Sequence, residues 1–340
     1  MMRVTKRRMT GLVAMLLPLG LLVVAPSTTS GAASATTVNV VGYSVVSTAF
    51  SALEKAFEAT PAGQGVTFTN SFGASTTQAE SVVAGQPADV TLFSQQPDLD
   101  LLVSAGLVSG SWASYSAGAA EQNIMTDSVV ALVVRRGNPL GITGWDSLTK
   151  KGVQIVTPDP ISSGSARWNL LAAYESQLQQ KQSAAKANTY LNKLIGNVVA
   201  EPPSGSKALA TFTSGAGNVL LAYEADGDTA ISTGQQVQVV EPKQNVLIQN
   251  PSALTTSGLA KPAAVAFYAY LFSVDGQTIW IHQHFRSTLP QFQKLQAQVF
   301  YTPPKLVTIK ALGGWTNVTN KFFSPTGIVT KDEAAHGFTS

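Results

Sequence analysis

Residues 159–173 read DPISSGSARWNLLAA, and this stretch decides which fold we expect. A β-branched run over residues 153–157 precedes it and predicts a strand, and an Ala-rich pattern over residues 166–181 predicts the helix that follows. Small hydroxyl residues and a glycine therefore occupy a junction between strand and helix. Such junctions recur in α/β proteins, and they leave the first N–H groups of the helix without a partner inside it.

The same alternation of strand and helix continues along the chain on both sides of this stretch. Further strands are predicted at residues 38–43, 66–70, 89–93, 127–134, 219–223 and 237–242. Further helices are predicted at residues 46–58, 76–83, 99–105, 184–195, 262–272 and 276–285. We therefore expect an α/β fold with largely parallel sheets.

Two lobes are expected, because a chain of 340 residues is long enough for about two domains. The motif RRGNP at residues 135–139 breaks the chain after the strand at 127–134, which suggests a crossing between lobes. We assign residues 36–126 and 240–340 to the first lobe and residues 127–239 to the second. A ligand would then bind in the cleft between them.

Residues 1–35 have the pattern of a secretory signal peptide and not of a folded segment. Basic residues open it, an apolar run follows over residues 11–25, and an Ala-Ser-Ala motif ends at Ala35. The alternative is an N-terminal membrane anchor, but the run is short for a bilayer and no charges stop it. We expect cleavage near Ala35 and a periplasmic or otherwise secreted mature protein.

The formal charge of +3 comes from this leader. Four of the 22 Lys and Arg residues and none of the 19 acids lie in it, so 18 basic residues face 19 acidic ones in the rest of the chain. A nearly neutral mature chain gives no argument for nucleic acid as a partner. The absence of cysteine excludes a disulfide framework, a thiol nucleophile, zinc–thiolate and iron–sulfur sites, and a lipid anchor on cysteine.

Three predicted helices begin with small hydroxyl residues: GASTT at 73–77, SSGSARW at 162–168 and SGSKA at 204–208. Each offers N–H groups at the positive end of a helix, which bind anions without a cationic side chain. The alternative for each is ordinary N-capping by Ser or Thr. None of the three holds Asp or Glu, which favours a fully ionised anion such as sulfate over a protonated phosphate that needs an acceptor.

The stretch at 159–173 resembles the signature segment of periplasmic sulfate-binding proteins, the soluble receptors of sulfate/thiosulfate ABC importers. Further similarities to that family occur in order, and together they extend over residues 38–329. They are VGY at 41–43, FGAS at 72–75, VRRGNP at 134–139, GWDSL at 144–148, GNVLLAYE at 217–224 and GGW at 313–315.

The resemblance implies a type II periplasmic-binding-protein fold and a dehydrated sulfate held mostly by backbone N–H groups. The chain differs from the family at three of the implied positions. Ser44 replaces an Asp that acts through its backbone, Ser165 replaces a Gly, and Tyr223 replaces a Trp whose indole N–H reaches the anion. The implied ligand-binding residues are Ser44, Ser75, Ser163, Gly164, Ser165, Gly205 and Tyr223.

Arg167 is expected to support the site from beneath the helix start by hydrogen-bonding carbonyl or carboxylate groups. The indoles of Trp145, Trp168 and Trp315 are expected to pack in the core or along the cleft. His282 and His284 have no nearby third ligand in the sequence, so we expect no metal site there, and we expect no cofactor.

The leading hypothesis is a monomeric, non-enzymatic receptor that delivers sulfate to the permease subunits of an ABC importer. One alternative is a receptor for thiosulfate, molybdate, tungstate or another tetrahedral oxyanion, because Tyr223 has a different reach from Trp. A second alternative is a secreted α/β hydrolase, although no catalytic motif occurs in the chain. A third is an anion-responsive sensor, although no kinase or DNA-binding segment accompanies it.

Overall fold

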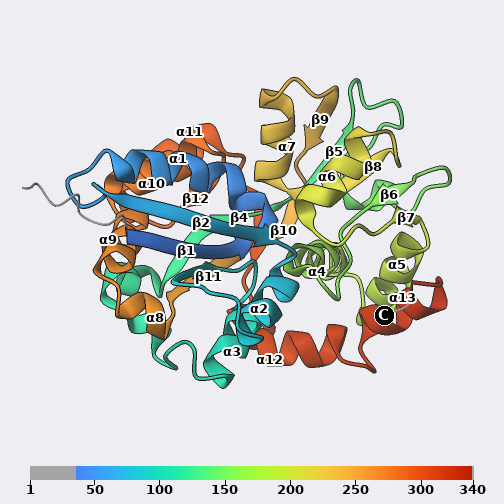
Figure 1. The fold of residues 1–340 in the computed structure, drawn as a ribbon. Coiled ribbons are helices and arrows are strands. Elements are labelled where there is room, and N and C mark those ends of the chain that lie inside the picture. The colour runs from blue at the N-terminus through green and yellow to red at the C-terminus, as the bar shows by residue number, and fades with distance from the viewer. Residues whose placement is uncertain (1–35, 339–340) are drawn as a thin grey trace, which may run out of the picture. The chain divides into compact units, whose positions relative to one another are not determined.

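The computed structural model describes residues 36–338, so the predicted signal peptide lies outside the described residues. Two sheets organise this part of the chain (Figure 1). The six-stranded sheet has the order β12-β4-β11-β3-β1-β2. Its strands are β1 (Thr36–Tyr43), β2 (Val66–Gly73), β3 (Val90–Leu92), β4 (Ile124–Ser128), β11 (Ile248–Leu254) and β12 (Arg286–Ser287).

Helices cover both faces of the six-stranded sheet. Neighbouring side chains on a strand point to opposite faces, so two adjacent buried residues show what covers each face. Val40 packs in one apolar cluster with residues of α1, α9 and α10, whereas its neighbour Val41 packs in another with residues of α2 and α3. The helices around this sheet are α1 (Ser47–Glu58), α2 (Ser75–Val83), α3 (Gln96–Ser104), α8 (Thr256–Leu259), α9 (Pro262–Leu271), α10 (Val274–His282) and α11 (Gln293–Val299).

The five-stranded sheet has the order β7-β6-β8-β5-β9 and is covered in the same way. Leu132 packs with residues of α4 and α5, and its neighbour Val133 packs on the opposite face with residues of α6 and α7. Its strands are β5 (Val130–Arg135), β6 (Ile155–Val156), β7 (Val198–Ala200), β8 (Val219–Tyr223) and β9 (Val237–Val240). Its helices are α4 (Gly164–Gln179), α5 (Ala184–Ile195), α6 (Gly205–Thr213) and α7 (Glu224–Ser232).

The C-terminal segment packs against the helices of the five-stranded sheet. A short parallel pair, β10 (Gln244–Val246) with β13 (Lys305–Val307), precedes α12 (Gly314–Val318) and α13 (Ile328–Ala335). In α12, Trp315 makes an edge contact with Trp168 of α4, with ring centroids 4.8 Å apart. In α13, Asp332 accepts a 2.8 Å hydrogen bond from Asn192 of α5. Residues 310–338, which the sequence analysis places with the first lobe, thus contact the second sheet's helices.

Two details of the predicted elements are wrong. The predicted strand at 127–134 is two strands in different sheets, β4 ending at Ser128 and β5 beginning at Val130. The chain crosses at the buried Val129, before the Arg135–Pro139 break. The sheets are also mixed and not largely parallel: β11 runs antiparallel to β3 and β4, and β5 runs antiparallel to β8 and β9. No prediction covered β11, which brings the chain back into the first sheet.

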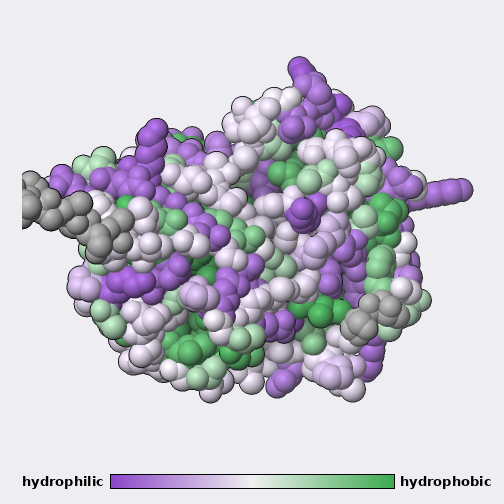
Figure 2. All heavy atoms as spheres, viewed as in Figure 1, coloured by the Kyte–Doolittle hydropathy of each residue, from purple (hydrophilic) through white to green (hydrophobic). Residues whose placement is uncertain are grey.

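The three tryptophans expected in the core are all buried: Trp145, Trp168 and Trp315 are at most 8% exposed. On the face shown in Figure 2, hydrophobic residues form small patches among hydrophilic ones. Among residues 36–338, no helix combines the length and the hydropathy that crossing a membrane requires.

Candidate anion-binding site

Residues at the carboxyl ends of strands from both sheets meet at one buried place. From the six-stranded sheet come Ser44 after β1, Ser75 after β2 and Ser94 after β3. From the five-stranded sheet come Ser163 after β6, Gly205 after β7 and Tyr223 at the end of β8. Ligands of open α/β sheets bind at this end of the strands.

Hydrogen bonds and close approaches connect these elements directly. The Thr76 N–H, in the first turn of α2, donates to the Ser162 carbonyl before α4 at 3.1 Å. The Ser206 N–H, in the first turn of α6, donates to Ser44 Oγ at 3.2 Å. The starts of α2, α4 and α6, predicted separately, therefore lie together with the short 3-10 turn Ser44–Val46.

Two glycines, Gly164 and Gly205, pack closely against residues of neighbouring elements at this place. A Cβ on Gly164 would stand 2.9 Å from Ser94 Cβ and Oγ, atoms of the other sheet. A Cβ on Gly205 would stand 3.2 Å from Ser165 Oγ and 2.9 Å from Val45 Cγ2. Glycine at both positions therefore lets the two halves of the site approach each other.

The first N–H groups of these helices have no partner among the described residues. No turn, loop or cap within residues 36–338 accepts a hydrogen bond from the N–H groups of Ser75, Gly164, Ser165 or Gly205. Each group lies in the first turn of a helix, where the helix itself supplies no acceptor. The aligned peptide dipoles also make these ends partly positive. Together they can hold an anion without a cationic side chain.

N-capping, the alternative for the three helix starts, explains one of them. Ser204 caps α6 by accepting a 3.4 Å hydrogen bond from the Lys207 N–H. Ser163 stands at the N-cap of α4 but makes no capping hydrogen bond, and its hydroxyl instead lies 2.8 Å from Ser165 Oγ. In α2 the N-cap residue is Ala74, which has no side chain that can cap. Capping therefore does not account for the Ser163 hydroxyl at the start of α4.

The hydroxyl of Ser75 is occupied within the protein. It donates to Asp98 Oδ2 at 2.6 Å and accepts from the Ser94 N–H at 2.9 Å. Burial raises the pKa of Asp98, and the hydrogen bonds from Ser75, Gln95 and Thr76 counteract this effect. Any contact between Ser75 and an anion therefore falls to its backbone N–H.

Tyr223 is fully buried and held by polar groups of the first sheet. Its phenol oxygen lies 2.7 Å from Ser94 Oγ and accepts a 3.4 Å hydrogen bond from Asn250 Nδ2. Burial raises the pKa of the Tyr223 phenol far above neutral, so it keeps its proton. Its ring centroid lies 5.9 Å from that of Tyr43, whose hydroxyl donates to Asn250 Oδ1 at 3.1 Å.

Arg167 lies under the start of α4. Its Nε donates to the Pro160 carbonyl at 2.8 Å, and its guanidinium carbon lies 5.2 Å from the centre of the Phe323 ring. Burial lowers the pKa of Arg167, while Asp98, Asp159 and Glu80 raise it. The guanidinium thus holds the loop that leads into α4.

Sequence reasoning missed two residues of this region, Ser94 and Asp226. Ser94 connects four partners: besides its bonds to Ser75 and Tyr223, its carbonyl accepts from Trp168 Nε1 at 2.8 Å and from Asn250 Nδ2 at 3.1 Å. The sequence could have indicated Ser94 only by its position directly after the strand predicted at residues 89–93. Asp226 lies in the first turn of α7, and no motif marked it.

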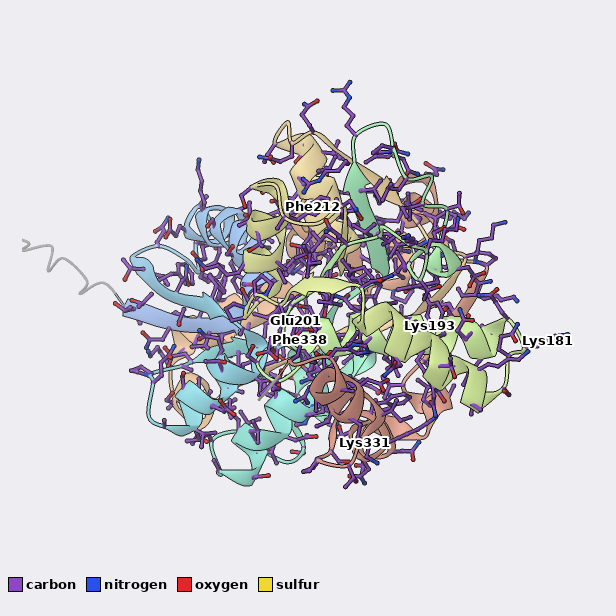
Figure 3. The ribbon with its side chains drawn as sticks, turned by 90° about the vertical axis from the view of Figure 1, so that its right-hand side faces the viewer. Lys181, Lys193, Glu201, Phe212, Lys331 and Phe338 are labelled. Atoms are coloured by element: carbon purple, nitrogen blue, oxygen red, sulfur yellow. The ribbon has the colours of Figure 1, made fainter. Side chains whose placement is uncertain are left out.

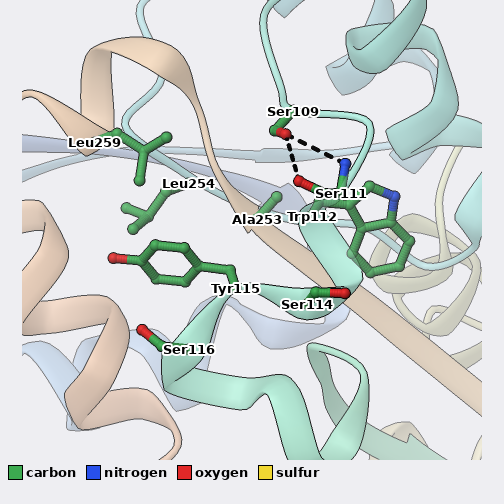
Figure 4. A pocket seen from close by; sticks show the side chains of 9 residues that line it. All are labelled: Ser109, Ser111, Trp112, Ser114, Tyr115, Ser116, Ala253, Leu254 and Leu259. Carbon is green, nitrogen blue, oxygen red and sulfur yellow. Dashed lines mark hydrogen bonds between the residues drawn. The ribbon is translucent and has the colours of Figure 1, made fainter.

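The site is closed. Ser44, Ser75, Ser163, Ser165 and Tyr223 are at most 8% exposed, and Gly164 and Gly205 are buried. A separate cavity of about 350 Å³ lies between β11, α8 and the segment of residues 109–116, which connects α3 to β4 (Figure 4). Ser109, Trp112 and Tyr115 line it, and none of the predicted site residues does. The predicted site residues therefore lie away from this cavity.

The histidines stay apart from the site. His282 is exposed, and His284 Nδ1 lies 3.9 Å from Asp228 Oδ2. In residues 36–338, no group of three His, Asp or Glu side chains is arranged to hold a metal ion. The only hydrogen-bond partner of the Ser163 hydroxyl in this part of the chain is another serine, not a base.

The chain forms two α/β lobes, each built on one sheet, and strands of both sheets end at the buried candidate site. This is the type II periplasmic-binding-protein fold of solute receptors. The chain belongs to the family of bacterial extracellular solute-binding proteins, whose model matches residues 38–286. The predicted fold class is thereby confirmed.

Named relatives cover most of the chain. A sulfate-binding protein of Synechococcus elongatus is 33% identical over 319 residues, 91% of this chain and 90% of the relative. A thiosulfate-binding protein of Pseudomonas aeruginosa is 31% identical and covers 78% of this chain and 82% of its own. The solved structure of the sulfate-binding protein SubI from Mycobacterium tuberculosis is 37% identical, with a TM-score of 0.81, and covers 85% of this chain and 100% of its own.

Proposed function

We propose that this chain captures sulfate outside the cytoplasm and delivers it to the permease subunits of an ABC importer. The observation that carries the proposal is the convergence, at the starts of α2, α4 and α6, of four N–H groups that have no partner among residues 36–338. Relatives named for sulfate and thiosulfate binding support the same ligand class. The ligand-binding residues are Ser44, Ser75, Ser163, Gly164, Ser165, Gly205 and Tyr223, with Arg167 in support.

The chemistry of these groups suits a bare dianion. Backbone N–H groups, the hydroxyls of Ser163 and Ser165 and the phenol of Tyr223 all donate hydrogen bonds. A buried sulfate has lost its water and needs a donor for each of its oxygens. Donors at three helix ends also bring three positive dipole ends to the anion. Salt screens such contacts less than it screens surface ion pairs, because the site is closed.

Capture requires the protein to open, since the site residues are buried. We place the boundaries between the lobes at the two crossings, close to the predicted ones at 126/127 and 239/240, with residues 310–338 packed on the second lobe. The crossings at Val129 and between β9 and β11 would act as the hinge. The anion would stabilise the closed form by binding groups of both lobes at once. The closed monomer, freed of its signal peptide near Ala35, would then dock on the permease.

A receptor role accounts for the hydroxyls better than hydrolysis does. A serine nucleophile needs a base within hydrogen-bond reach, and the Ser163 hydroxyl instead pairs with Ser165 at 2.8 Å. The named relatives are binding proteins. We therefore propose a non-enzymatic protein that uses no cofactor.

A receptor for thiosulfate or molybdate is the second candidate, and Tyr223 is the observation that favours it. Its phenol is fixed by Ser94 at 2.7 Å, on the wall of the site where the family resemblance implies an indole. A phenol O–H has a different reach from an indole N–H, so the site can suit an oxyanion of another size or with one different atom.

Titration calorimetry of the mature chain tests the proposal. Sulfate, thiosulfate, molybdate and phosphate are titrated in turn at pH 7, with one-to-one binding of sulfate as the expected result. Phosphate should bind far more weakly. A heat of binding on titration with phosphate or a sugar, together with no heat of binding for sulfate, would overturn the proposal. Tighter binding of thiosulfate or molybdate would favour the second candidate.

A further inference from the structure

One ion pair joins the halves of the protein next to the candidate site. Arg286 of β12 holds both carboxylate oxygens of Glu224: its Nε donates to Oε1 at 2.5 Å and its Nη2 donates to Oε2 at 2.7 Å. Glu224 begins α7 directly after Tyr223, and its N–H donates to the Val129 carbonyl at 3.0 Å. Val129 is the crossing between the two sheets, so the pair lies both at the proposed hinge and beside a residue of the candidate site.

The geometry and the burial of this pair make it a strong contact. Its two charge-assisted hydrogen bonds are the arrangement that guanidinium and carboxylate groups favour. The side chain of Glu224 is 3% exposed and that of Arg286 is 13% exposed. The segment after α11 also holds the guanidinium, because Nη2 donates to the Tyr301 carbonyl at 2.6 Å and the Phe300 ring centre lies 5.1 Å from its Cζ. Separating the pair would leave a buried charge without a partner, which is costly.

The two crossings between the sheets lie side by side at this place. Asn245 of β10, on the second crossing, is fully buried and binds Val130 on both sides of its peptide plane. It accepts from the Val130 N–H at 3.1 Å and donates to the Val130 carbonyl at 2.7 Å. Groups close to a hinge move little when lobes rotate about it. A side chain as long as that of Arg286 can therefore reach partners on either side of this hinge.

A second carboxyl group stands beside Arg286 on its own sheet. Asp127 of β4 is directly opposite Arg286 in the antiparallel pairing of β4 with β12, so the two side chains share one face. Among residues 36–338, Asp127 Oδ1 is buried without a hydrogen-bond partner, and Arg286 Nη1 makes no hydrogen bond. Both residues line one cavity of about 270 Å³. An unused acceptor and an unused donor thus border the same space.

The other acids near Arg286 do not belong to its sheet. Besides Glu224, the charge of Arg286 lowers the pKa of Asp127, Asp228 and Glu241 against the effect of burial. Asp228 is on α7, and Glu241 lies in the crossing after β9. Asp127 is therefore the carboxyl group of this set that would stay beside Arg286 if the lobes separated.

We propose, on the basis of the sulfate-receptor function, that Arg286 exchanges partners when the protein opens, from Glu224 in the closed form to Asp127 in the open form. Glu224 leaves with the second lobe, whereas Asp127 keeps its register opposite Arg286. The guanidinium then has a carboxylate partner in both states, which lowers the cost of opening. The three side chains are positioning residues that set the affinity for sulfate without touching it.

The two carboxyl groups should therefore have opposite effects on sulfate binding. Sulfate binds the closed form, so the measured affinity falls as the open form gains population. Loss of the Asp127 charge removes the partner of Arg286 in the open form and should tighten binding. Loss of the Glu224 charge removes the partner in the closed form and should weaken binding. An ion pair that only supports the fold predicts no tightening from a change at Asp127.

Calorimetry and stopped-flow fluorescence with sodium sulfate at pH 8 measure the affinity and the dissociation rate. Asp127→Asn should bind sulfate at least about fivefold more tightly than the wild type, with slower dissociation. Glu224→Gln should bind it at least about tenfold more weakly, with faster dissociation. The double variant should return to within about threefold of the wild type, because neither state then has its partner. Asp228→Asn, which removes a carboxylate near Arg286 but none of its hydrogen bonds, should change the affinity less than about twofold.

An unchanged or weaker affinity in a folded Asp127→Asn overturns the exchange, and so does an Asp228→Asn that weakens binding as much as Glu224→Gln. The wild type gives a test that needs no variant: a crystal structure of its ligand-free open form should show Arg286 bound to Asp127. An open form in which Arg286 still binds Glu224, or binds neither carboxylate, overturns the exchange. So does a ligand-free protein that stays closed in solution, because nothing then separates the pair. No binding of sulfate by the wild type overturns the proposed function, whereas the open-form structure still decides the exchange.

Discussion

The phenol oxygen of Tyr223 lies 2.7 Å from the hydroxyl oxygen of Ser94, and this hydrogen bond joins the two sheets across the candidate site. Tyr223 ends β8 of the five-stranded sheet, and Ser94 follows β3 of the six-stranded sheet. Asn250 of β11 donates to the same phenol at 3.4 Å. Because the two residues follow strands of different sheets, the proposed opening of the lobes would break this contact.

Tyr223→Phe should weaken sulfate binding. It removes the phenol and leaves the buried Ser94 hydroxyl without this partner, at a cost of about 1–3 kcal/mol in the closed form. The affinity should fall by about 5- to 150-fold at constant pH, as measured by calorimetry. Tyr115→Phe is the matched control, because that ring lines the separate cavity of Figure 4. An unchanged affinity in Tyr223→Phe would show that the phenol does not act in binding.

Tyr223→Trp should change the ranking of oxyanions. The indole donates a hydrogen bond but cannot accept one, which restricts the site to ligands that only accept. Because sulfate, thiosulfate and molybdate all only accept near neutral pH, any change in ranking must come from the different reach of the indole N–H, which should favour sulfate over the other two in competition calorimetry. The same ranking in wild type and variant would remove position 223 from the determinants of selectivity.

Gly164→Ala should hinder closure without unfolding the protein. The added Cβ would stand 2.9 Å from the Ser94 side chain across the site and 3.0 Å from Gln95 Cγ. Opening relieves this clash, so the thermal midpoint without ligand should change little while the sulfate affinity falls at least about tenfold. Gly110→Ala is the control, since its nearest neighbour would be Val103 Cγ1 at 4.0 Å. Equal affinities in the two variants would contradict the role of Gly164.

The stability of the protein should decrease as pH rises from about 4.5 to about 9, because of the half-buried Glu201 and the buried Glu333. Burial and mutual repulsion raise the pKa of Glu201 to about 9, and burial raises that of Glu333 to about 7. Unfolded glutamates titrate near 4.3, so the folded state binds more protons in this window and loses stability as the pH rises through it. Both residues line a cavity of about 500 Å³ with Phe338, which Figure 3 shows beside Glu201.

Glu333→Gln tests this pair, because an amide can donate to Glu201 and carries no charge. The variant should melt about 2–4 °C higher than the wild type at pH 8 for each kcal/mol of repulsion relieved, and no higher at pH 4.5. Glu121→Gln serves as the matched control. Parallel pH profiles of melting in wild type and Glu333→Gln would exclude the pair as the cause.

Local sequence patterns predicted most of the helices and strands. The predicted helix at 184–195 and strand at 219–223 coincide with α5 and β8, whose apolar residues follow a clear period or an unbroken buried run. The same criterion failed over residues 127–134. Both β4 and β5 are buried, so the apolar run continues through the crossing at Val129 and hides it.

Ser94 shows why part of the site was missed. A single serine after a strand has many ordinary explanations, and its four hydrogen-bond partners come from α2, α4, β8 and β11. Only the folded chain brings these elements together. The helix starts at 73–77, 162–168 and 204–208 were recognisable, because each signal lies within a few consecutive residues.

By itself the sequence predicted the hydrogen-bond donors of the proposed site, since glycine and serine at a helix start offer their own backbone N–H and hydroxyl groups. It also indicated that no acid lies inside those segments. Only the tertiary structure decided that an acid nevertheless borders them, because α7 brings Asp226 beside Gly205 and Ser165. The burial that raises the pKa of Asp226 comes from segments distant in the chain, and desolvation is a property of the assembled fold.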